Sequence, residues 1–504
     1  MSEAISLQTL LDEGLAERVI GDPAVKFRGV RHDSRRVEAG DLFVALGGQV
    51  FDGADYSAAA AKAGAVAIAS EQAVESPLPV VIVEHGLRAL AAISKRFYGD
   101  PAGQLPVIGI TGTNGKTTVA YLVEQTLLAL SQRPAIAGTI EVRGPAGHLP
   151  ATHTTPMADD LTRICRWAVD SQASHFVTEV SSHGLAMYRV DSLRFAVAAF
   201  TNLSQDHLDF HGDLERYGAA KARLFRDFKP THAVINIDDD FGAALAQEVS
   251  SGLIRYSVRG ERSAELHVTS ARYGRAGVNA EVATPQGAVV LHSTLLGAHN
   301  LENLVCALGI CFSLGFSAER VAAALSTATG APGRLQRVSH PAEVLVFVDY
   351  AHTPDALTRV CDVLRKQTTG RLLVVFGCGG DRDRGKRPLM AQAVAAHADF
   401  AVVTSDNPRT ESPTQILQDT AKGFERDGWQ AVRLLDRASE SKCFLVEADR
   451  AAAIAAALAA AEPGDTVLVA GKGHENYQII GTEKRPFDDV QVATAAIARL
   501  SEER

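Results

Sequence analysis

A turn rich in glycine and threonine carries the clearest chemical signal in the sequence. Residues 111–118 read Thr-Gly-Thr-Asn-Gly-Lys-Thr-Thr and follow the apolar run Leu105–Ile110. Apolar residues at helical spacing come next, from Val119 onward. A glycine-rich turn between a buried strand and a helix start offers backbone N–H groups and the helix dipole to phosphate oxygens. Lys116 is placed to reach the β- and γ-phosphates of a nucleotide.

The spacing of this turn is GxxGKTT and not the common GxxxxGK[ST], because Ile110 stands where the first glycine is expected. The alternative is a chance glycine-rich turn, which the strand and helix on either side disfavour. A hydroxyl of one of the two threonines would face Mg²⁺. The sequence therefore predicts an ATP-binding loop made of Gly112, Thr113, Asn114, Gly115, Lys116, Thr117 and Thr118.

Two further predicted strands end in carboxylates and histidines. Glu179 lies at the end of the run His175–Val180, and residues 201–211, TNLSQDHLDFH, follow the run Ala196–Phe200. A carboxylate at a strand end beside a nucleotide loop is a candidate Mg²⁺ ligand, since Mg²⁺ takes oxygen ligands that it shares with phosphates. Taken alone, Glu179 is equally compatible with a surface residue, and each histidine is more often structural than metal-binding.

Polar residues also follow three predicted strands in the last third of the chain. They are residues 377–384 (GCGGDRDR), 406–409 (DNPR) and 471–475 (GKGHE). In open α/β sheets, ligands bind at the carboxyl ends of the strands. Each of these residues alone is more often a surface charge, but their shared position at strand ends indicates a second site on this sheet.

Strand-like and helical patterns alternate along most of the chain, which predicts an α/β fold. Linker-like sequences at residues 99–103 and 330–333 divide it into three expected domains, 1–103, 104–336 and 337–504. The second and third domains both resemble site-bearing sheets, and we expect the main site between them.

The composition narrows the class of protein. The chain has 504 residues, a net charge of -9 and an isoelectric point near 6.0, which argues against a general nucleic-acid binder. Six scattered cysteines form no CxxC pair and indicate free thiols in a reducing compartment. The sequence shows no signal peptide and no apolar run long enough to span a membrane. We expect a cytoplasmic monomer without membrane insertion.

Five segments in order and spacing resemble the Mur ligase family: GTNGKTT, EVSSHGL, FTNLSQDHLDFHGDLERYGAAKARLF, GAHNLENLVCAL and APGRLQRV. The resemblance covers nearly the whole chain. It implies an N-terminal UDP-binding α/β domain, a central P-loop ATPase-type sheet and a C-terminal Rossmann-like domain. It also implies that Glu179 and His207 bind Mg²⁺ together with Thr117, and that Lys221 is carbamylated. A lysine ammonium repels Mg²⁺, whereas its CO₂ adduct supplies an anionic oxygen ligand; from the bare sequence Lys221 is only a helix-surface lysine.

The resemblance implies further nucleotide contacts by Asn300, Arg334 and Asp349, for which loop structure is the alternative. The segment HDSRRVEAGDLFVALGGQVFDG is similar to the uridine-binding signature of the branch that adds the third peptide residue. The contacts implied for a UDP-muramoyl dipeptide are His32, Ser34, Gln49, Val50, Phe51, His153, Thr154, Thr155, Ser181, Met187 and Arg189. His153, Met187 and Ala54 stand where relatives often have asparagine, glutamine and histidine, which leaves individual muramoyl contacts open.

The DNPR sequence resembles the recognition motif of family members that use meso-diaminopimelate. This substrate is lysine with a second, distal carboxylate, and burying that carboxylate costs several kcal/mol unless it is paired. A guanidinium can bind it through two parallel hydrogen bonds. Arg409, helped by Arg382 and Asn407, is the predicted clamp, and Glu475 would face the distal ammonium. The implied contacts are Arg382, Asp406, Asn407, Pro408, Arg409, Gly471 and Glu475.

The activity that this resemblance implies is ATP-dependent ligation of meso-diaminopimelate to UDP-N-acetylmuramoyl-L-alanyl-D-glutamate. Three alternatives are an L-lysine-adding muramoyl ligase, a folylpolyglutamate synthase and a nucleotide-binding module without catalysis. The second alternative lacks the N-terminal DSR…GDLF segment and DNPR. Amino-acid-dependent release of phosphate separates an enzyme from the third.

Overall fold

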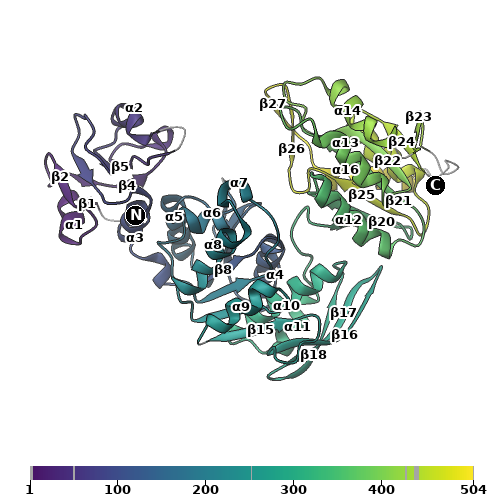
Figure 1. Ribbon diagram of the computed structural model, residues 1–504, viewed down its shortest axis with the longest axis horizontal. Coiled ribbons are helices and arrows are strands. Elements are labelled where there is room, and N and C mark those ends of the chain that lie inside the picture. Colours follow the sequence, from purple (N-terminus) through teal and green to yellow (C-terminus); the bar gives the residue numbers. More distant parts are fainter. Residues whose placement is uncertain are drawn as a thin grey trace. The chain divides into compact units, whose positions relative to one another are not determined.

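A computed structural model describes residues 4–48, 52–151, 153–250, 252–425, 428–435 and 442–502 (Figure 1). The chain divides into two compact units. The first comprises Met1–Ser270, Glu281–Val290 and Glu302–Leu325, and the second Ala271–Ala280, Leu291–Leu301 and Ser326–Arg504. No described helix is both long enough and apolar enough to cross a bilayer.

The N-terminal part of the first unit is a small α/β layer. Its elements are β1 (Ile5–Ser6), α1 (Leu7–Asp12), β2 (Arg18–Ile20), β3 (Lys26–Phe27), β4 (Gly29–Arg31), β5 (Asp41–Val44), α2 (Ser57–Ala63), β6 (Ala67–Ser70), β7 (Val80–Ile82) and α3 (Gly86–Phe97). The sheet order is β2-β7-β6-β5-β4, parallel except for β2, and β1 pairs with β3. The helical pattern of the N-terminal residues forms only α1, because Gly14 turns the chain at φ 69° toward β2.

A larger sheet follows, and most of it belongs to the first unit. Its strands are β8 (Val107–Thr111), β9 (Pro134–Ala137), β10 (Val142–Gly144), β11 (Gly147–Leu149), β12 (His175–Glu179), β13 (Val197–Phe200), β14 (His232–Asn236), β15 (Leu253–Ser257), β16 (Leu266–Gly274), β17 (Gly277–Thr284) and β18 (Gly287–Ser293). They lie in the order β11-β10-β9-β12-β8-β13-β14-β15-β16-β17-β18. The helices are α4 (Lys116–Ala129), α5 (Ala158–Asp170), α6 (Ser182–Ala186), α7 (Leu208–His211), α8 (Leu214–Arg226), α9 (Asp240–Glu248), α10 (Ala298–Ser313) and α11 (Ala318–Leu325).

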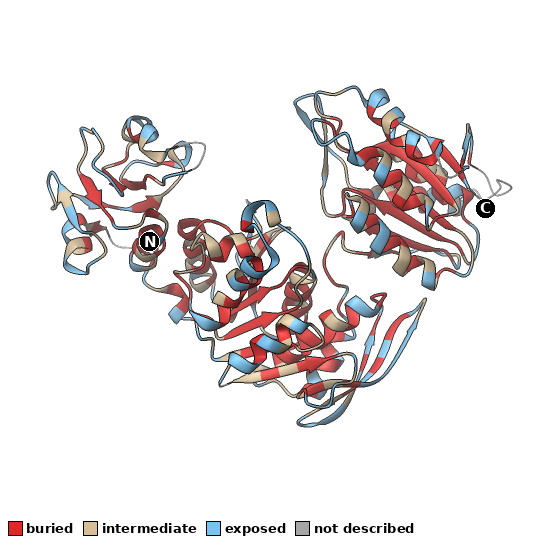
Figure 2. Cartoon of the chain, in the orientation of Figure 1, coloured by how far each residue is buried: buried red, intermediate tan, exposed pale blue. Residues whose placement is uncertain are grey.

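The three central strands of this sheet bring their carboxyl ends to one edge. β8 runs parallel to β12 and β13, with Glu179 opposite Ile110 and Phe200 opposite Thr111. Every residue of these strands is buried, as expected for a parallel sheet covered by helices on both faces (Figure 2). The polar residues that follow each strand therefore emerge side by side.

The second unit contains another largely parallel sheet. Its elements are β19 (Gln336–Val338), β20 (Leu345–Asp349), α12 (Pro354–Gln367), β21 (Leu372–Cys378), α13 (Lys386–Ala395), β22 (Phe400–Ser405), α14 (Pro413–Glu425), β23 (Gln430–Val432), β24 (Cys443–Val446), α15 (Arg450–Ala460), β25 (Thr466–Ala470), β26 (Tyr477–Ile480), β27 (Glu483–Pro486) and α16 (Asp489–Glu502). The order is β19-β20-β25-β21-β22-β24-β23, with only β19 antiparallel.

Apolar side chains cover both faces of this second sheet. One cluster, around Phe376 and Phe424, packs below α12, α13 and α14, and another, around Phe400 and Ile454, packs below α15 and α16. The register places Cys378 opposite Ser405. The turns after β20, β21, β22 and β25 thus emerge at one edge, as the sequence predicts.

Arg450 and Asp489 form an ion pair that is completely shielded from solvent, with a separation of 2.7 Å. Asp489→Asn would leave the guanidinium without its carboxylate and should lower the free energy of unfolding of the second unit by about 3–5 kcal/mol. Arg485 and Glu483 form an exposed pair with the same separation of 2.7 Å, so Glu483→Gln is the matched control. Glu483→Gln should lower the free energy of unfolding by less than about 1 kcal/mol. Calorimetric unfolding measures both, and equal losses would contradict the prediction.

Candidate functional site

The predicted phosphate loop connects β8 to α4 in a conformation that requires its glycines. Gly112 has φ 150° and Gly115 φ 87°. A Cβ at Gly112 would lie 1.9 Å from Thr201 Oγ1, and one at Gly115 would lie 2.5 Å from Asn303 Oδ1. Neither position can hold a larger residue without displacing its neighbour.

Residues from the turn after β13 hold this loop in place. Thr113 N donates to Asn202 O at 2.8 Å, and Asn114 N donates to Asn202 Oδ1 at 2.9 Å. Lys116 Nζ donates to the carbonyls of Gly112 and Thr113 at 2.8 and 2.9 Å. The lysine ammonium therefore folds back over the loop and lies where a phosphate would be cradled.

The carboxylate of Glu179 lies beside the start of α4 and is only 1% exposed. Its Oε2 accepts hydrogen bonds from the hydroxyls of Thr117 and Thr139 at 2.7 and 3.1 Å, and its Oε1 accepts from Thr139 N at 2.8 Å. The buried hydroxyl next to Glu179 is that of Thr117, whereas Thr118 is half-buried. The oxygen atoms of Thr117 and Glu179 therefore lie side by side next to the predicted phosphate loop, where they could hold a metal ion.

Lys221 is buried, which its sequence pattern alone does not predict. It lies in α8, is 1% exposed and donates from Nζ to Gly112 O at 2.8 Å. Its ammonium is 4.2 Å from the centre of the Tyr217 ring. Burial and then the charge of Lys116 hold the pKa of Lys221 well below its usual value of 10.5. Folding therefore disfavours the charged form of this amine relative to the unfolded chain.

The histidines after β12 and β13 form an aromatic cluster. The ring of His183 lies 4.8 Å from that of His207 and 5.5 Å from that of His211, between centroids. Burial lowers the pKa of His183 and of His211. His207 is exposed, packs edge-on near Tyr217 and faces Asp206 with Nε2 at 3.5 Å. Among the described side chains, no hydrogen bond or ion pair joins His207 to Glu179, and its role as a ligand stays a prediction.

Several of the predicted muramoyl-dipeptide residues surround the end of β12. Thr155 Oγ1 donates to Glu179 O at 2.9 Å and lies 3.0 Å from Ser181 Oγ. Thr139 Oγ1 lies 3.0 Å from Thr154 Oγ1. Arg189 donates to Thr155 O at 2.9 Å.

Arg189 is a cation without a matching anion within the described ranges of the chain. It forms no ion pair there, its second nitrogen approaches Met187 Sδ at 3.3 Å, and burial lowers its pKa. A guanidinium in this state can accept an anionic ligand with little rearrangement. His153, in contrast, is exposed; partial desolvation and then the charge of Arg189 lower its pKa.

The predicted UDP-binding residues lie in the N-terminal layer. His32 Nδ1 lies 2.8 Å from the carboxylate of Asp159. Burial lowers the pKa of His32, but the hydrogen bond to Asp159 and the charges of Asp159, Asp160 and Asp33 together raise it above its usual value. A cavity of about 780 Å³ is lined by His32, Ser34 and Tyr56 among other residues. The predicted contacts at Gln49, Val50 and Phe51 lie outside the described residues.

In the second unit, a cavity of about 560 Å³ collects the predicted diaminopimelate residues. It is lined by Tyr350, His352, Thr353, Gly377, Cys378, Gly379, Arg382, Asp383, Lys386, Arg387, Met390, Asp406, Asn407, Arg409, Gly471, Glu475 and Tyr477. Pro408 lies behind it, where its carbonyl oxygen would be 1.8 Å from a Cβ at Gly380.

Two guanidinium groups of this cavity have only backbone partners. Arg409 donates to Gly380 O at 2.7 Å and Arg382 donates to Asp381 O at 3.3 Å. Neither forms an ion pair with a carboxylate in the part of the chain that the structure describes. Arg409 also has φ 54°, a left-handed conformation that the turn after β22 imposes. The cavity therefore presents two cations without matching anions.

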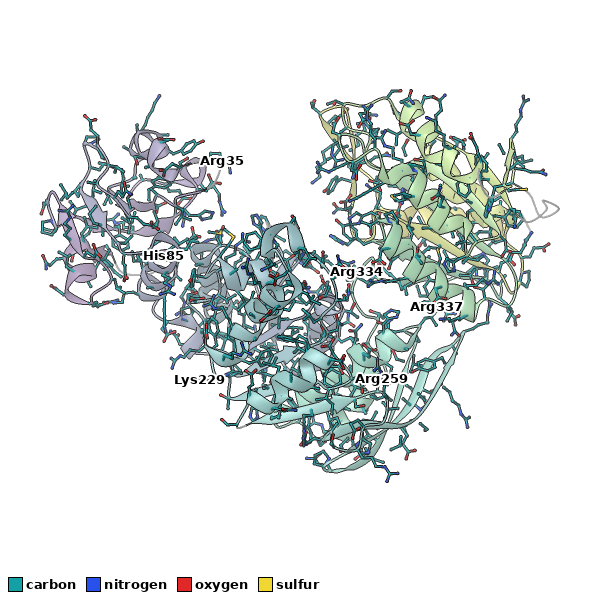
Figure 3. The ribbon with its side chains drawn as sticks, in the orientation of Figure 1. Arg35, His85, Lys229, Arg259, Arg334 and Arg337 are labelled. Atoms are coloured by element: carbon teal, nitrogen blue, oxygen red, sulfur yellow. The ribbon has the colours of Figure 1, made fainter. Side chains whose placement is uncertain are left out.

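The predicted nucleotide residues of the second unit support backbone turns. Asp349 accepts from Leu335 N at 2.7 Å and from Ala351 N at 2.8 Å, and burial raises its pKa. Asn300 is buried and donates to Leu296 O at 2.8 Å. The guanidinium carbon of Arg334, labelled in Figure 3, lies 4.9 Å from the centre of the Tyr350 ring.

Three residues that contact the predicted site residues were not predicted from the sequence. Thr139 binds Glu179, Tyr217 covers Lys221, and Lys472 contacts Asn407 and Glu475. Thr139 follows β9, which adjoins β12 in the sheet, so its position after a strand was a usable signal.

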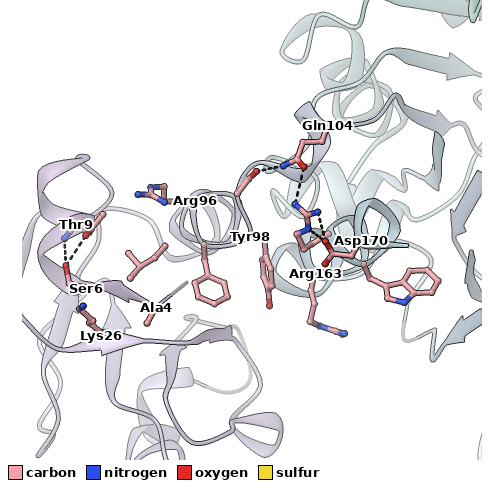
Figure 4. Close-up of a pocket in the computed structure, with 14 residues that line it drawn as sticks. Ala4, Ser6, Thr9, Lys26, Arg96, Tyr98, Gln104, Arg163 and Asp170 are labelled. Carbon is pink, nitrogen blue, oxygen red and sulfur yellow. Dashed lines mark hydrogen bonds and ion pairs between the residues drawn. The ribbon is translucent and has the colours of Figure 1, made fainter. Parts of the chain in front are cut away.

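Another cavity, of about 960 Å³, lies between the N-terminal layer and α5 (Figure 4). None of the sequence-predicted site residues that the structure describes lines it. Three of its arginines already bind carboxylates, in the pairs Arg96–Glu13, Arg163–Asp160 and Arg166–Asp170. We therefore assign no ligand to it.

Comparison with protein families matches three segments of the chain. Residues 26–98 match the Mur ligase family, catalytic domain; residues 110–311 match the Mur ligase middle domain; and residues 333–473 match the Mur ligase, glutamate ligase domain.

Curated relatives and a solved structure are similar over almost the full length. The UDP-N-acetylmuramoyl-L-alanyl-D-glutamate–2,6-diaminopimelate ligase of Geobacter metallireducens is 42% identical over 95% of this chain and 96% of its own. The ligase of the same name from Pseudomonas aeruginosa is 45% identical over 92% and 94%. A solved structure of a ligase with that name is 35% identical, covers 100% of both chains and has a TM-score of 0.71.

Replacing Lys221 with methionine should stabilise the protein when no metal or nucleotide is present. Because the pKa of Lys221 is lowered in the folded state, its charged form is less favourable there than in the unfolded chain, and below pH 10.5 the lysine lowers the stability of the folded protein. Each kcal/mol gained should raise the melting temperature by about 2–4 °C. The gain should shrink as the pH rises toward 10.5, where the unfolded lysine also loses its proton. Thermal scans in CO₂-free buffer measure it; a less stable variant at neutral pH would contradict the prediction.

Proposed function

Because the chain belongs to the Mur ligase family, we propose that it ligates meso-diaminopimelate to UDP-N-acetylmuramoyl-L-alanyl-D-glutamate in peptidoglycan synthesis. ATP provides the driving force and leaves as ADP and phosphate. The observation that carries the proposal is the pairing of two sites in one chain. One is a phosphate loop with Thr117 and Glu179 beside it, and the other is a cavity with the unpaired guanidinium groups of Arg382 and Arg409.

The proposed reaction has two steps. The γ-carboxylate of the D-glutamyl residue attacks the γ-phosphorus of ATP, and the bond to the bridging oxygen of ADP breaks. The resulting acyl phosphate is attacked by an amine of diaminopimelate, which loses a proton as inorganic phosphate leaves. Lys116 and the loop amides neutralise the transferring phosphoryl group, whose transition state needs positioning and electrostatic stabilisation. Gly112, Thr113, Asn114, Gly115 and Thr118 complete this proposed loop.

The residues around Glu179 fit a Mg²⁺ ion. Thr117 Oγ1 and Glu179 Oε2 are 2.7 Å apart, close to the ~2.9 Å between neighbouring ligands of an octahedral site with ~2.05 Å bonds. When bound, Mg²⁺ would neutralise phosphate charge. Lys221 fits the proposed carbamate, because its lowered pKa supplies the neutral amine that adds to CO₂. His207 is the fourth proposed ligand.

The acceptor substrate is proposed to bind in the first unit. Arg189 is suited to a carboxylate of the dipeptide, since it is half-buried and has no ion pair within the described ranges. The proposed neighbours are His153, Thr154, Thr155, Ser181 and Met187 for the muramoyl dipeptide and His32, Ser34, Gln49, Val50 and Phe51 for the UDP moiety.

The second unit is proposed to bind diaminopimelate. Arg409 and Arg382 would pair with its distal carboxylate, and Glu475 with its distal ammonium. Asp406, Asn407, Pro408 and Gly471 would shape the cavity around them. Asn300, Arg334 and Asp349 are proposed to contribute to nucleotide binding.

We further propose the domain boundaries 1–103 for UDP binding, 104–336 for ATP and 337–504 for the amino acid. A monomer acting in the cytoplasm, where ATP and nucleotide-linked precursors occur, fits this reaction. The six buried cysteines are free, as expected in a reducing compartment. The deciding experiment measures phosphate release with ATP, the UDP-muramoyl dipeptide and a panel of amino acids. Release with L-lysine alone, or none with any amino acid, would refute the proposal.

Lys116→Ala should reduce kcat by at least about 10²-fold, because the ammonium over the loop stabilises charge on the transferring phosphoryl group. ADP production measures the effect, and circular dichroism checks the fold. Lys229→Ala, at an exposed turn of the same unit, is the control and should retain activity. Activity of the Lys116 variant within tenfold of the wild type would exclude this role.

Arg409 should determine the choice of amino acid. The wild-type enzyme should use meso-diaminopimelate and discriminate against L-lysine by about 10⁴ or more, because lysine would leave the half-buried guanidinium of Arg409 without a carboxylate partner. Arg409→Ala should raise the KM for diaminopimelate at least about 30-fold and leave the KM for ATP nearly unchanged. Arg409→Lys keeps the charge, loses the two-pronged geometry and should also be impaired. Equal kcat/KM for lysine and diaminopimelate in the wild type would refute the specificity.

A further inference from the structure

Lys472 is a fully buried cation directly behind the cavity of the second unit. It lies in the turn after β25, has no exposed surface and does not line the cavity. Its Nζ donates to Asn407 Oδ1 at 3.1 Å and to Glu475 Oε2 at 3.2 Å. Burying an ammonium is costly unless it is paired, so these two contacts decide where the side chain lies.

The contact with Lys472 fixes the orientation of the Asn407 amide. Asn407 Oδ1 accepts from Lys472 Nζ and from Ile479 N at 2.9 Å, while its Nδ2 donates to Glu475 Oε2 at 2.9 Å. Rotating the amide would turn its N–H groups toward an ammonium and a backbone N–H, which are donors only. The amide nitrogen therefore always faces Glu475.

Glu475 is left with one oxygen for a ligand. Its Oε2 accepts from both Lys472 and Asn407, whereas no donor in the described part of the chain reaches Oε1. The carboxylate lines the cavity and is 19% exposed. The arrangement holds an anionic oxygen toward the cavity in a single orientation.

We infer that Lys472 is a positioning residue for amine recognition: through Glu475 and Asn407, it holds the carboxylate oxygen that binds the distal ammonium of the amino-acid substrate. The inference rests on the proposed function. It predicts that Lys472 affects the binding of the amino acid and leaves phosphoryl transfer unaffected, because Lys472 touches neither substrate nor nucleotide site. A purely structural lysine would instead affect all substrates together.

A double-mutant cycle with the full-length enzyme tests this inference. Lys472→Met should raise the KM for diaminopimelate at least about 30-fold, with the KM values for ATP and the UDP-dipeptide unchanged and kcat at saturating diaminopimelate within tenfold. Glu475→Gln should show a comparable increase. In the double variant the KM should resemble that of Glu475→Gln alone, since both changes remove the same contact.

Lys484→Met is the matched control. Lys484 lies in β27 with its ammonium 3.6 Å from the centre of the Tyr477 ring, but it contacts neither Glu475 nor Asn407 through any described hydrogen bond. Its replacement should leave the KM for diaminopimelate within threefold of the wild type. An equal increase in both lysine variants would show a general charge effect and overturn the inference.

The outcomes separate this inference from the function on which it rests. Suppose that the wild-type enzyme releases phosphate with diaminopimelate. If Lys472→Met then has an unchanged KM for diaminopimelate, or if the effects of Lys472→Met and Glu475→Gln on this KM multiply in the double variant, the positioning role is refuted and the function stands. If diaminopimelate supports no turnover, the function itself fails. Should Lys472→Met not fold, Lys472→Gln and Lys472→Arg replace it. Arginine, which keeps the charge, should then recover most of the affinity that glutamine loses, and equal losses would refute the inference.

Discussion

The carboxylate of Glu179 connects the parts of the first unit that must cooperate. It accepts hydrogen bonds from Thr117 at the start of α4 and from Thr139 after β9. The backbone carbonyl of Glu179 accepts a hydrogen bond from Thr155. A nearly unexposed carboxylate without such donors would be strongly destabilising. The phosphate loop and the proposed dipeptide site therefore share one anchor, and a displacement of Glu179 would disturb both.

In the second unit, buried cations likewise have hydrogen-bonding partners. Lys472 and Arg450 are buried beneath the turns that follow β22 and β25, and each is satisfied by carboxylate and carbonyl oxygens. Arg382 and Arg409, in contrast, face the cavity with backbone partners only. Lys472 and Arg450 thus hold the turns in place, while Arg382 and Arg409 can pair with an anionic ligand.

The sequence predicted the strand ends well, because continuous apolar runs such as Thr466–Ala470 coincide with buried parallel strands. The phosphate loop and Glu179 followed from that pattern. Lys221 did not, since its burial depends on how α8 packs against Gly112, and only the family resemblance pointed to it. Lys472 was overlooked for a similar reason. Its neighbours Gly471 and Gly473 suggest an open turn, and one of its two partners, Asn407, follows a different strand.

The contacts of Arg450 have a consequence for motions of the native state. Its guanidinium binds the carbonyls of Ser405 and Ala470, which precede two turns that line the cavity of the second unit, and also Asp489, the first residue of α16. Detachment of α16 would leave a buried guanidinium without its counter-ion beneath these turns. Local opening of this helix and ordering of the cavity are therefore linked equilibria. A ligand that orders the turns should slow amide hydrogen exchange in α16 without touching it.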